Sequence, residues 1–233
     1  MNEEILFSSP EQVAQDQQRF ISKVYGWMAG ALAITGLTAW WIASSESMTQ
    51  FIFGNRGIFI FLLIGQLLLV GSLAGWINKM SSRTATIIFV AYSVLTGVVF
   101  SSLFLIYTTG SIATTFLITG AMFAVMSIYG WTTGNDLTKF GSILFMLLIG
   151  LIIASIVNIF VGSTMLYWIS TYVGVFIFTG LVAYDTQKIK NMGTYVQEGT
   201  EEHRKGAIIG ALSLYLDFIN LFMMLLRIFG SRR

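Results

Sequence analysis

The sequence predicts an all-α integral membrane protein, a bundle of seven transmembrane helices with the last helix at its centre. Hydrophobic residues make up 55% of the 233 residues and charged residues only 10%, whereas a soluble domain averages about 25% charged residues. Seven stretches reach the roughly 20 apolar residues that one helical crossing of a bilayer needs. Their apolar character is continuous, which excludes the alternating pattern of membrane barrel strands.

Residues 1–20 form a polar and acidic lead before the first stretch. Ser9, Pro10 and Glu11 are typical of a helix start, with a capping serine, a proline in the first turn and an early acid. A small interfacial helix and a frayed tail are both consistent with this lead. It has no cationic segment before an apolar core, so we expect no cleavable signal peptide and the first crossing to direct insertion.

The crossings are expected in one domain, residues 21–229, followed by a basic tail at residues 230–233. The seven stretches are 21–44, 56–78, 84–107, 111–133, 139–161, 165–187 and 207–229. The longest internal connection is predicted to run from Asn191 to about Lys205, and it contains the single histidine, His203. Three glycine pairs have the spacing that lets membrane helices approach closely: Gly26/Gly30, Gly71/Gly75 and Gly206/Gly210.

The Lys and Arg residues predict that the N-terminus lies inside. Nine of the 13 would then be inside and four outside, as the positive-inside rule favours. The last segment is the least certain crossing. If it were re-entrant, the tail would return to the inside, and twelve Lys and Arg residues would lie inside against one outside. We expect a full crossing, because 207–229 is long enough to span the bilayer.

Two acidic residues, Asp185 and Asp217, fall within predicted crossings, whereas the other nine lie in the lead or the connections. A carboxylate at membrane depth is costly, so it normally faces the bundle interior and has a function. Both lie on the order of 10–15 Å from the inner surface, at 1.5 Å per residue. Consecutive antiparallel helices could therefore bring these two carboxyls together.

The seventh stretch also carries a polar stripe. Positions spaced by 3, 4, 3, 4 and 3 residues share one face of a helix, and here they are Gly210, Ser213, Asp217, Asn220, Met224 and Arg227. A polar stripe through an otherwise apolar helix indicates a central helix that faces a polar seam or a pore.

Each of these polar residues also has a purely structural interpretation. Asp185 could pair with Lys188 three residues later, and Asp217 could anchor hydrogen bonds from tyrosine or asparagine. Gln66 and Asn158 could join the polar seam, but a hydrogen bond between helices is the favoured interpretation of each.

Two segments carry a resemblance to a known family. Residues 183–189, Ala-Tyr-Asp-Thr-Gln-Lys-Ile, and residues 211–222, Ala-Leu-Ser-Leu-Tyr-Leu-Asp-Phe-Ile-Asn-Leu-Phe, resemble the signature region of the Bax inhibitor family, also called the transmembrane Bax-inhibitor-motif family. The resemblance extends over essentially the whole chain and is closest to the bacterial inner-membrane branch. It implies a multi-pass protein of the bacterial cytoplasmic membrane, with seven helices and the last one surrounded by the others.

The resemblance also implies a pH-sensitive calcium leak. In the family, aspartates at the positions of Asp185 and Asp217 form a hydrogen-bonded pair that senses pH, and an arginine of the second helix region can lock that pair. Here Gln66 stands where the family has a glutamate, and the interior of the second stretch has no arginine. Lys79 and Arg83, at its inner end, are therefore the candidate lock residues.

A mechanism follows from two carboxylates held close in a low dielectric. They cannot both ionise cheaply, so they are expected to share a proton in a bond that latches the sixth helix to the seventh. A change of pH would alter the charge of the pair and bias the separation of the helices. Calcium prefers several oxygen ligands, and Asp185, Asp217, Asn220 and Ser213 could bind it weakly in transit.

Other functions are less well supported by the residues. The competing hypothesis is a non-conducting membrane protein that modulates a partner, such as a membrane quality-control protease. We expect no enzyme, because the single histidine is placed in a connection and no nucleophile with a base, phosphate loop or zinc motif occurs. No cofactor and no nucleic-acid partner is expected, and the absence of cysteine excludes disulfides and thiolate metal sites. The expected partners are the lipid bilayer and calcium.

Overall fold

The fold is described by a computed structural model that covers residues 10–195 and 199–233. Short capped turns separate long helices, and serine, asparagine and threonine side chains cap the starts of α3, α4, α6 and α9. In chain order the helices are α1 (Pro10–Ala43), α2 (Glu46–Phe53), α3 (Arg56–Trp76), the 3₁₀ turn η1 (Ile77–Lys79), α4 (Ser82–Phe100), α5 (Leu103–Ile106), α6 (Thr109–Thr132), α7 (Thr138–Val161), α8 (Thr164–Tyr195) and α9 (Glu201–Phe229).

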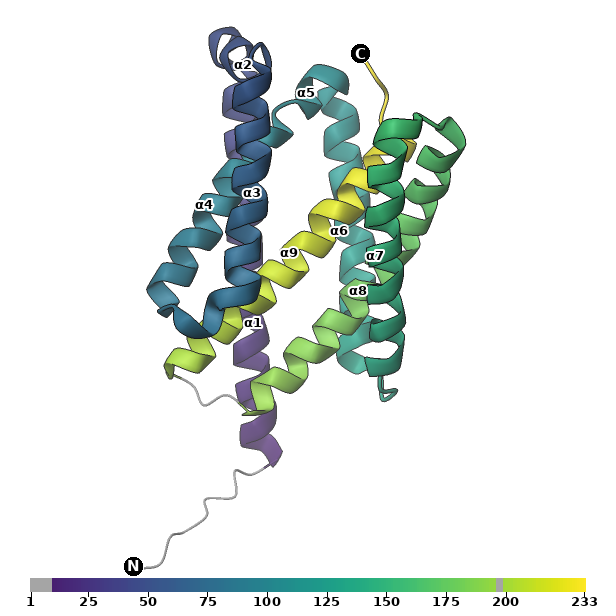
Figure 1. Cartoon of the computed structure of the whole chain (residues 1–233). Coiled ribbons are helices and arrows are strands. Elements are labelled where there is room, and N and C mark those ends of the chain that lie inside the picture. The colour runs from purple at the N-terminus through teal and green to yellow at the C-terminus, as the bar shows by residue number, and fades with distance from the viewer. Residues whose placement is uncertain (1–9, 196–198) are drawn as a thin grey trace, which may run out of the picture.

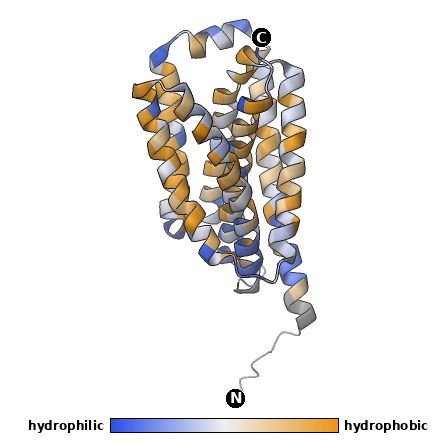
Figure 2. Cartoon of the chain, turned by 90° about the vertical axis from the view of Figure 1, so that its right-hand side faces the viewer, coloured by the Kyte–Doolittle hydropathy of each residue, from blue (hydrophilic) through white to orange (hydrophobic). Residues whose placement is uncertain are grey.

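Seven spans in the described part of the chain are long and apolar enough to cross a membrane, which confirms the predicted all-α bundle. Hydrophobic residues cover the middle of these helices, and hydrophilic residues gather towards both ends of the bundle (Figure 2). This distribution is the one that a protein needs when lipid surrounds its middle and water covers its ends.

Three predicted boundaries differ from the structure. The helix that starts at Pro10, as Ser9-Pro10-Glu11 predicted, continues without a break to Ala43, so no separate interfacial helix precedes the first crossing; residues 1–9 of the lead lie outside the described residues. The first connection contains a helix, α2, that was not predicted. The α8 helix extends to Tyr195 and α9 begins at Glu201, so the connection between them is shorter than expected.

The predicted placement of His203 in a connection was wrong. It lies in the first turn of α9, where its side chain is only 4% exposed. Its ring packs edge-on against Phe20 of α1, with 5.1 Å between the ring centroids. The Thr200 hydroxyl accepts a hydrogen bond from the His203 backbone N–H and starts the helix there.

The α9 helix is the centre of the bundle, as predicted. Figure 1 shows it crossing the bundle obliquely, with the other long helices around it. In its apolar 18-residue stretch 72% of the residues are buried inside the protein, against 6% in α3 and 11% in α7. Both hydrophobic clusters of the core include α9, which packs against α1, α4, α6 and α8.

The α9 helix also runs from one end of the bundle to the other, as the full-crossing prediction required. Its 29 residues give a length of about 44 Å at 1.5 Å per residue. The tail then bonds to the turn before α6, at the end of the bundle opposite the start of α1 (Figure 1). There the Ser231 carbonyl accepts from Thr108 N–H at 3.1 Å, and Arg233 N–H donates to the Ile106 carbonyl at 3.0 Å.

Candidate functional site

The two intramembrane aspartates come from the packed pair α8 and α9. Asp185 lies on α8 and Asp217 on α9, and their carboxyl groups are within hydrogen-bonding reach of each other. The Asp217 side chain is only 5% exposed, and Asp185 is partly buried. The structure thus brings together the two acids that the sequence singled out.

The hydrogen bonding of the pair is incomplete when both groups are ionised. A carboxylate only accepts hydrogen bonds, and Asp217 Oδ2 is buried without a hydrogen-bond partner. A single proton on either carboxyl group would supply the missing donor and would bond α8 to α9. Buried polar atoms are normally paired, so this orphaned oxygen marks a place where a proton or a cation would be accommodated.

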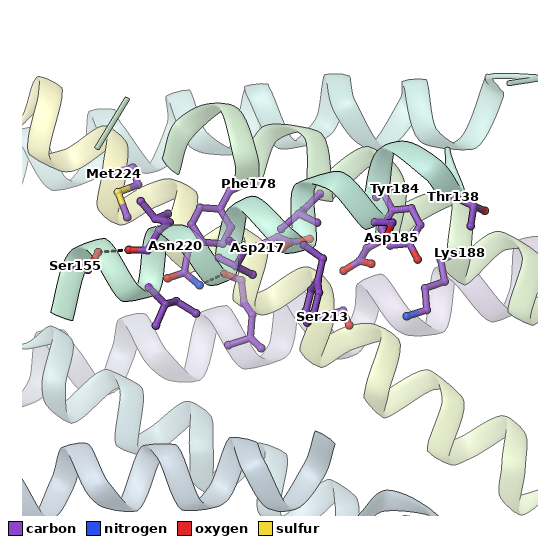
Figure 3. A pocket seen from close by; sticks show the side chains of 18 of the residues that line it. Thr138, Ser155, Phe178, Tyr184, Asp185, Lys188, Ser213, Asp217, Asn220 and Met224 are labelled. Atoms are coloured by element: carbon purple, nitrogen blue, oxygen red, sulfur yellow. Dashed lines mark hydrogen bonds between the residues drawn. The ribbon is translucent and has the colours of Figure 1, made fainter. Parts of the chain in front are cut away.

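The pair lies in the wall of a cavity of about 770 Å³ between α7, α8 and α9. Its walls are mainly apolar, and its polar side chains follow its length in the order Lys188, Asp185, Asp217 and Asn220 (Figure 3). The α7 helix packs against α8 rather than α9, which leaves this space between α7 and α9. Exposed α7 side chains at the rim, such as Phe145 and Ile152, show that the cavity borders the lipid-facing surface.

Most of the predicted stripe on α9 lines this cavity. Ser213, Asp217, Asn220 and Met224 all face it, and Asn220 Nδ2 donates to the Leu216 carbonyl of its own helix at 2.8 Å. The two ends of the stripe do not. Gly210 packs close to Ile189 and Val24, and the Arg227 guanidinium lies over the Tyr167 ring, 5.2 Å from its centroid.

The cation beside the pair is Lys188, not one of the predicted lock residues. Lys188 lines the same cavity one turn from Asp185 and interacts with it electrostatically. Lys79 lies in η1 and Arg83 at the start of α4, and neither lines the cavity. Their role as lock residues therefore stays a prediction that this structure does not test.

Gln66 and Asn158 make structural hydrogen bonds and do not line this cavity. Gln66 Nε2 donates to Thr96 Oγ1 at 2.9 Å and joins α3 to α4. Asn158 Oδ1 accepts from Ser163 N–H at 2.9 Å and closes the end of α7, where Gly162 takes a positive φ of 66°. A glycine suits this position because it enters the left-handed region without strain.

Sequence reasoning missed two groups of residues around α9. The α7 wall of the cavity contributes Thr138, Ser142 and Ser155, and the four-residue spacing of the first two would have placed them on one face. On the opposite side of α9, Tyr215 Oη lies 2.7 Å from Thr35 Oγ1, which donates to the Ser93 carbonyl at 2.9 Å. Small hydroxyl residues in apolar stretches were the signal for this network.

The site offers few ligands for a resident metal ion. In the described part of the chain, no three His, Cys, Asp or Glu side chains are grouped as a metal site. Two carboxyl groups with Ser213 and Asn220 nearby fall short of the six to eight oxygens that calcium takes when tightly bound. The residues present therefore fit weak and transient cation binding better than storage.

The fold and the site define a multi-pass membrane protein with a paired-carboxyl cavity beside its central helix. Residues 17–233 match the family model described as Inhibitor of apoptosis-promoting Bax1. The chain belongs to the Bax inhibitor family.

Curated relatives cover nearly the whole chain. The inner membrane protein YbhL of Escherichia coli (strain K12) is 51% identical over 217 residues, which is 93% of each chain. An uncharacterized protein of Borreliella burgdorferi is 47% identical over 93% of this chain and 94% of its own. The uncharacterized protein YrjE of Lactococcus lactis is 36% identical over 94% of each chain. With the seven apolar helices, these relatives support a multi-pass protein of the bacterial inner membrane.

Proposed function

We propose that this protein is a pH-sensitive calcium leak channel whose gate is the Asp185–Asp217 pair. The observation that carries the proposal is the buried pair itself, which joins two neighbouring helices in the wall of a cavity and leaves Asp217 Oδ2 without a donor. A buried pair with only structural roles would be expected to have its hydrogen bonds complete.

The gate works through the number of protons on the pair. With one proton, the two carboxyl groups share a hydrogen bond that holds α8 to α9. Adding or removing a proton changes the charge and the bonding of the pair, and the preferred separation of α8 and α9 changes with it. Lys188, beside Asp185, contributes a positive charge at one end of the cavity.

Calcium would pass along the polar side of the cavity. Asp185, Asp217, Ser213 and Asn220 all line it and together supply oxygen ligands, which are the ligands that calcium prefers. Their small number favours passage over retention. The proposal assigns the protein no enzymatic activity and no cofactor, and calcium is its permeant ion.

We also propose that the N-terminus faces the cytoplasm. Nine Lys and Arg residues lie towards the end of the bundle where α1 begins, and the other four lie towards the opposite end. The positive-inside rule favours the more basic end as the cytoplasmic one. The acidic pair is then reached from the cytoplasmic side past Lys188.

The test is calcium flux through purified full-length protein in liposomes, measured with an enclosed calcium indicator over a pH series from about 5.5 to 8. The wild-type flux is expected to change with pH. In Asp217→Asn and in Asp185→Asn, only one carboxyl group of the pair still titrates, and the amide can keep a hydrogen bond to it at every pH. The pH profiles of calcium flux in both variants are therefore expected to flatten. Asp136→Asn is the matched control, because Asp136 is an exposed carboxylate in the α6–α7 connection.

Each outcome decides between the hypotheses. A pH profile for Asp217→Asn that matches the wild type would exclude the pair as the sensor. A flattened profile for Asp136→Asn would show that surface carboxylates, not the pair, set the response. Absence of flux from the folded wild type at every pH would exclude the channel and favour a non-conducting regulator of a partner protein.

A further inference from the structure

A second hollow, of about 480 Å³, opens at the basic end of the bundle and has no part in the proposed gate. It lies between the inner parts of α1, α4 and α9, and each helix contributes one cation: Lys23, Arg83 and Arg204. These residues are far apart in the sequence, and the helix packing brings them to one hollow. All three side chains are exposed and available to a ligand.

The charge of the hollow remains positive after its internal contacts are counted. Glu201 is the neighbouring acid, but its carboxylate already accepts from the Ser82 backbone N–H and from Ser82 Oγ at 2.9 Å. It lies 4.0 Å from Arg204 Nε, at the limit of an ion pair. Arg204 also donates to the Gly199 and Thr200 carbonyls, and a guanidinium with five N–H groups still has donors left.

The rest of the lining consists of Ser82 and Thr86 of α4 and three apolar side chains. The apolar ones are Trp27 of α1, Ile87 of α4 and Ile208 of α9, and the Ile87 side chain is 68% exposed on the outer surface of α4. A small soluble anion would use the cations and leave this apolar surface uncovered. A ligand with an anionic head and an apolar body would use both, and the hollow lies where helix ends meet the membrane interface.

We propose that this hollow binds the headgroup of an anionic phospholipid, with its phosphate between Arg83, Arg204 and Lys23. The acyl chains would descend over Ile87 and the edge of Trp27. Basic pockets between transmembrane helices on the cytoplasmic side are suited to such headgroups, and each nearby Lys or Arg contributes about a fivefold gain in affinity. Since the lipid contacts α1, α4 and α9 together, it would hold the central helix to its neighbours.

The test measures binding of phosphatidylglycerol to the purified full-length protein. The protein is reconstituted in phosphatidylcholine nanodiscs with increasing phosphatidylglycerol, and native mass spectrometry counts the retained lipids. The wild type is expected to retain phosphatidylglycerol in preference to phosphatidylcholine. Arg83→Gln should weaken this retention about fivefold, and Lys23→Gln with Arg83→Gln and Arg204→Gln on the order of 100-fold.

Matched variants separate a site from general charge. Lys139→Gln removes one exposed cation at the same end of the bundle, at the start of α7, and should leave retention unchanged; Arg83→Lys keeps the charge and should restore most of it. Equal losses in Lys139→Gln and Arg83→Gln would overturn the proposal. Displacement of the lipid by millimolar inorganic phosphate would also overturn it, since the hollow would then be a site for the free ion.

The triple variant must be folded for its loss to count, and size-exclusion and circular dichroism profiles like those of the wild type establish this. If it does not fold, the pair Lys23→Gln with Arg83→Gln leaves the Arg204 contacts at the start of α9 intact. An expected loss of about 25-fold in that pair supports the site, and unchanged retention rejects it.

Discussion

Two buried polar side chains of α9 differ in whether their hydrogen bonds are complete. Thr35 donates its hydroxyl proton to the Ser93 carbonyl, so Tyr215 is the donor in the bond between Tyr215 Oη and Thr35 Oγ1. In this series of hydrogen bonds from Tyr215 through Thr35 to Ser93, each hydroxyl proton therefore has an acceptor. Asp217 lies two residues further, towards the cavity, with one oxygen unpartnered. The complete network suits a structural joint, and the incomplete one suits a gate.

The structural joint gives the first prediction at the scale of single residues. Tyr215→Phe removes the bond to Thr35 without leaving a buried donor unpaired, because Thr35 still donates to Ser93. The free energy of unfolding in detergent should fall by about 0.5–1.5 kcal/mol. Tyr129→Phe, at a ring that is 45% exposed on α6, is the control and should change little. Equal effects of the two substitutions would mean that the Tyr215 bond does not stabilise the fold.

The sequence predicted the aspartates but not this joint, for a physical reason. A carboxylate at membrane depth is costly and rare, so Asp185 and Asp217 stood out. A serine or threonine in a helix can bond to a carbonyl of its own preceding turn, as Ser93 does to Phe89, so it carries no comparable cost. Partners such as Thr35 and Tyr215 are 180 residues apart, and only the tertiary packing selects them.

At the scale of helices, close approach depends on glycine, but not where spacing alone predicted it. A Cβ added at Gly26, Gly30, Gly71 or Gly75 would meet nothing within 4 Å, so these pairs do not form helix contacts. Gly206 and Gly210 do face neighbouring side chains. The tightest approaches of one helix backbone to another are elsewhere, with Gly130 of α6 against the Ala183 backbone and Gly97 of α4 against the Thr35 backbone of α1. Many membrane glycines share this spacing, so the spacing does not identify the facing helix.

The contact of α6 with α8 gives the second prediction. Gly130→Ala would place its methyl group on the carbonyl of Ala183, two residues before Asp185, and backbone atoms cannot move aside as a side-chain end can. We expect the free energy of unfolding to fall by about 1–3 kcal/mol. Gly120→Ala is the matched control on the same helix, since nothing lies within 4 Å of its added Cβ. It should be neutral or stabilising by about 0.5–1 kcal/mol, the gain in helix propensity.

The same pair of variants tests whether α8 is positioned by α6. If both substitutions destabilise equally, the loss comes from the glycines themselves and not from the helix contact. If Gly130→Ala is as stable as Gly120→Ala, α8 can move away from α6 at little cost. That result would contradict the close approach.

At the scale of the whole molecule, the number of crossings could be predicted but the helix ends could not. The apolar thickness of the bilayer sets the length of each apolar stretch in the sequence. Seven such stretches were therefore enough to predict the seven spans of the structure. Helix α8 continues beyond the apolar stretch to Tyr195, because backbone hydrogen bonding continues a helix in water after its apolar residues end. This extension and the early start of α9 also explain why His203 was misplaced in a connection.

The tail and the α6–α7 connection lie at opposite ends of the bundle, and this gives the last prediction. The tail bonds to the turn before α6, while the α6–α7 connection lies at the other end of the bundle. The chain has no cysteine, so single cysteines report their location without interference. Ser231→Cys and Asn135→Cys replace exposed side chains at the two ends. With the N-terminus inside, a membrane-impermeant maleimide should label Ser231→Cys in intact spheroplasts, and Asn135→Cys only after lysis.

The opposite pattern would invert the topology and put the basic end outside. Labelling of both or neither before lysis would contradict a seventh helix that crosses the membrane, since only a full crossing puts these two positions on different sides.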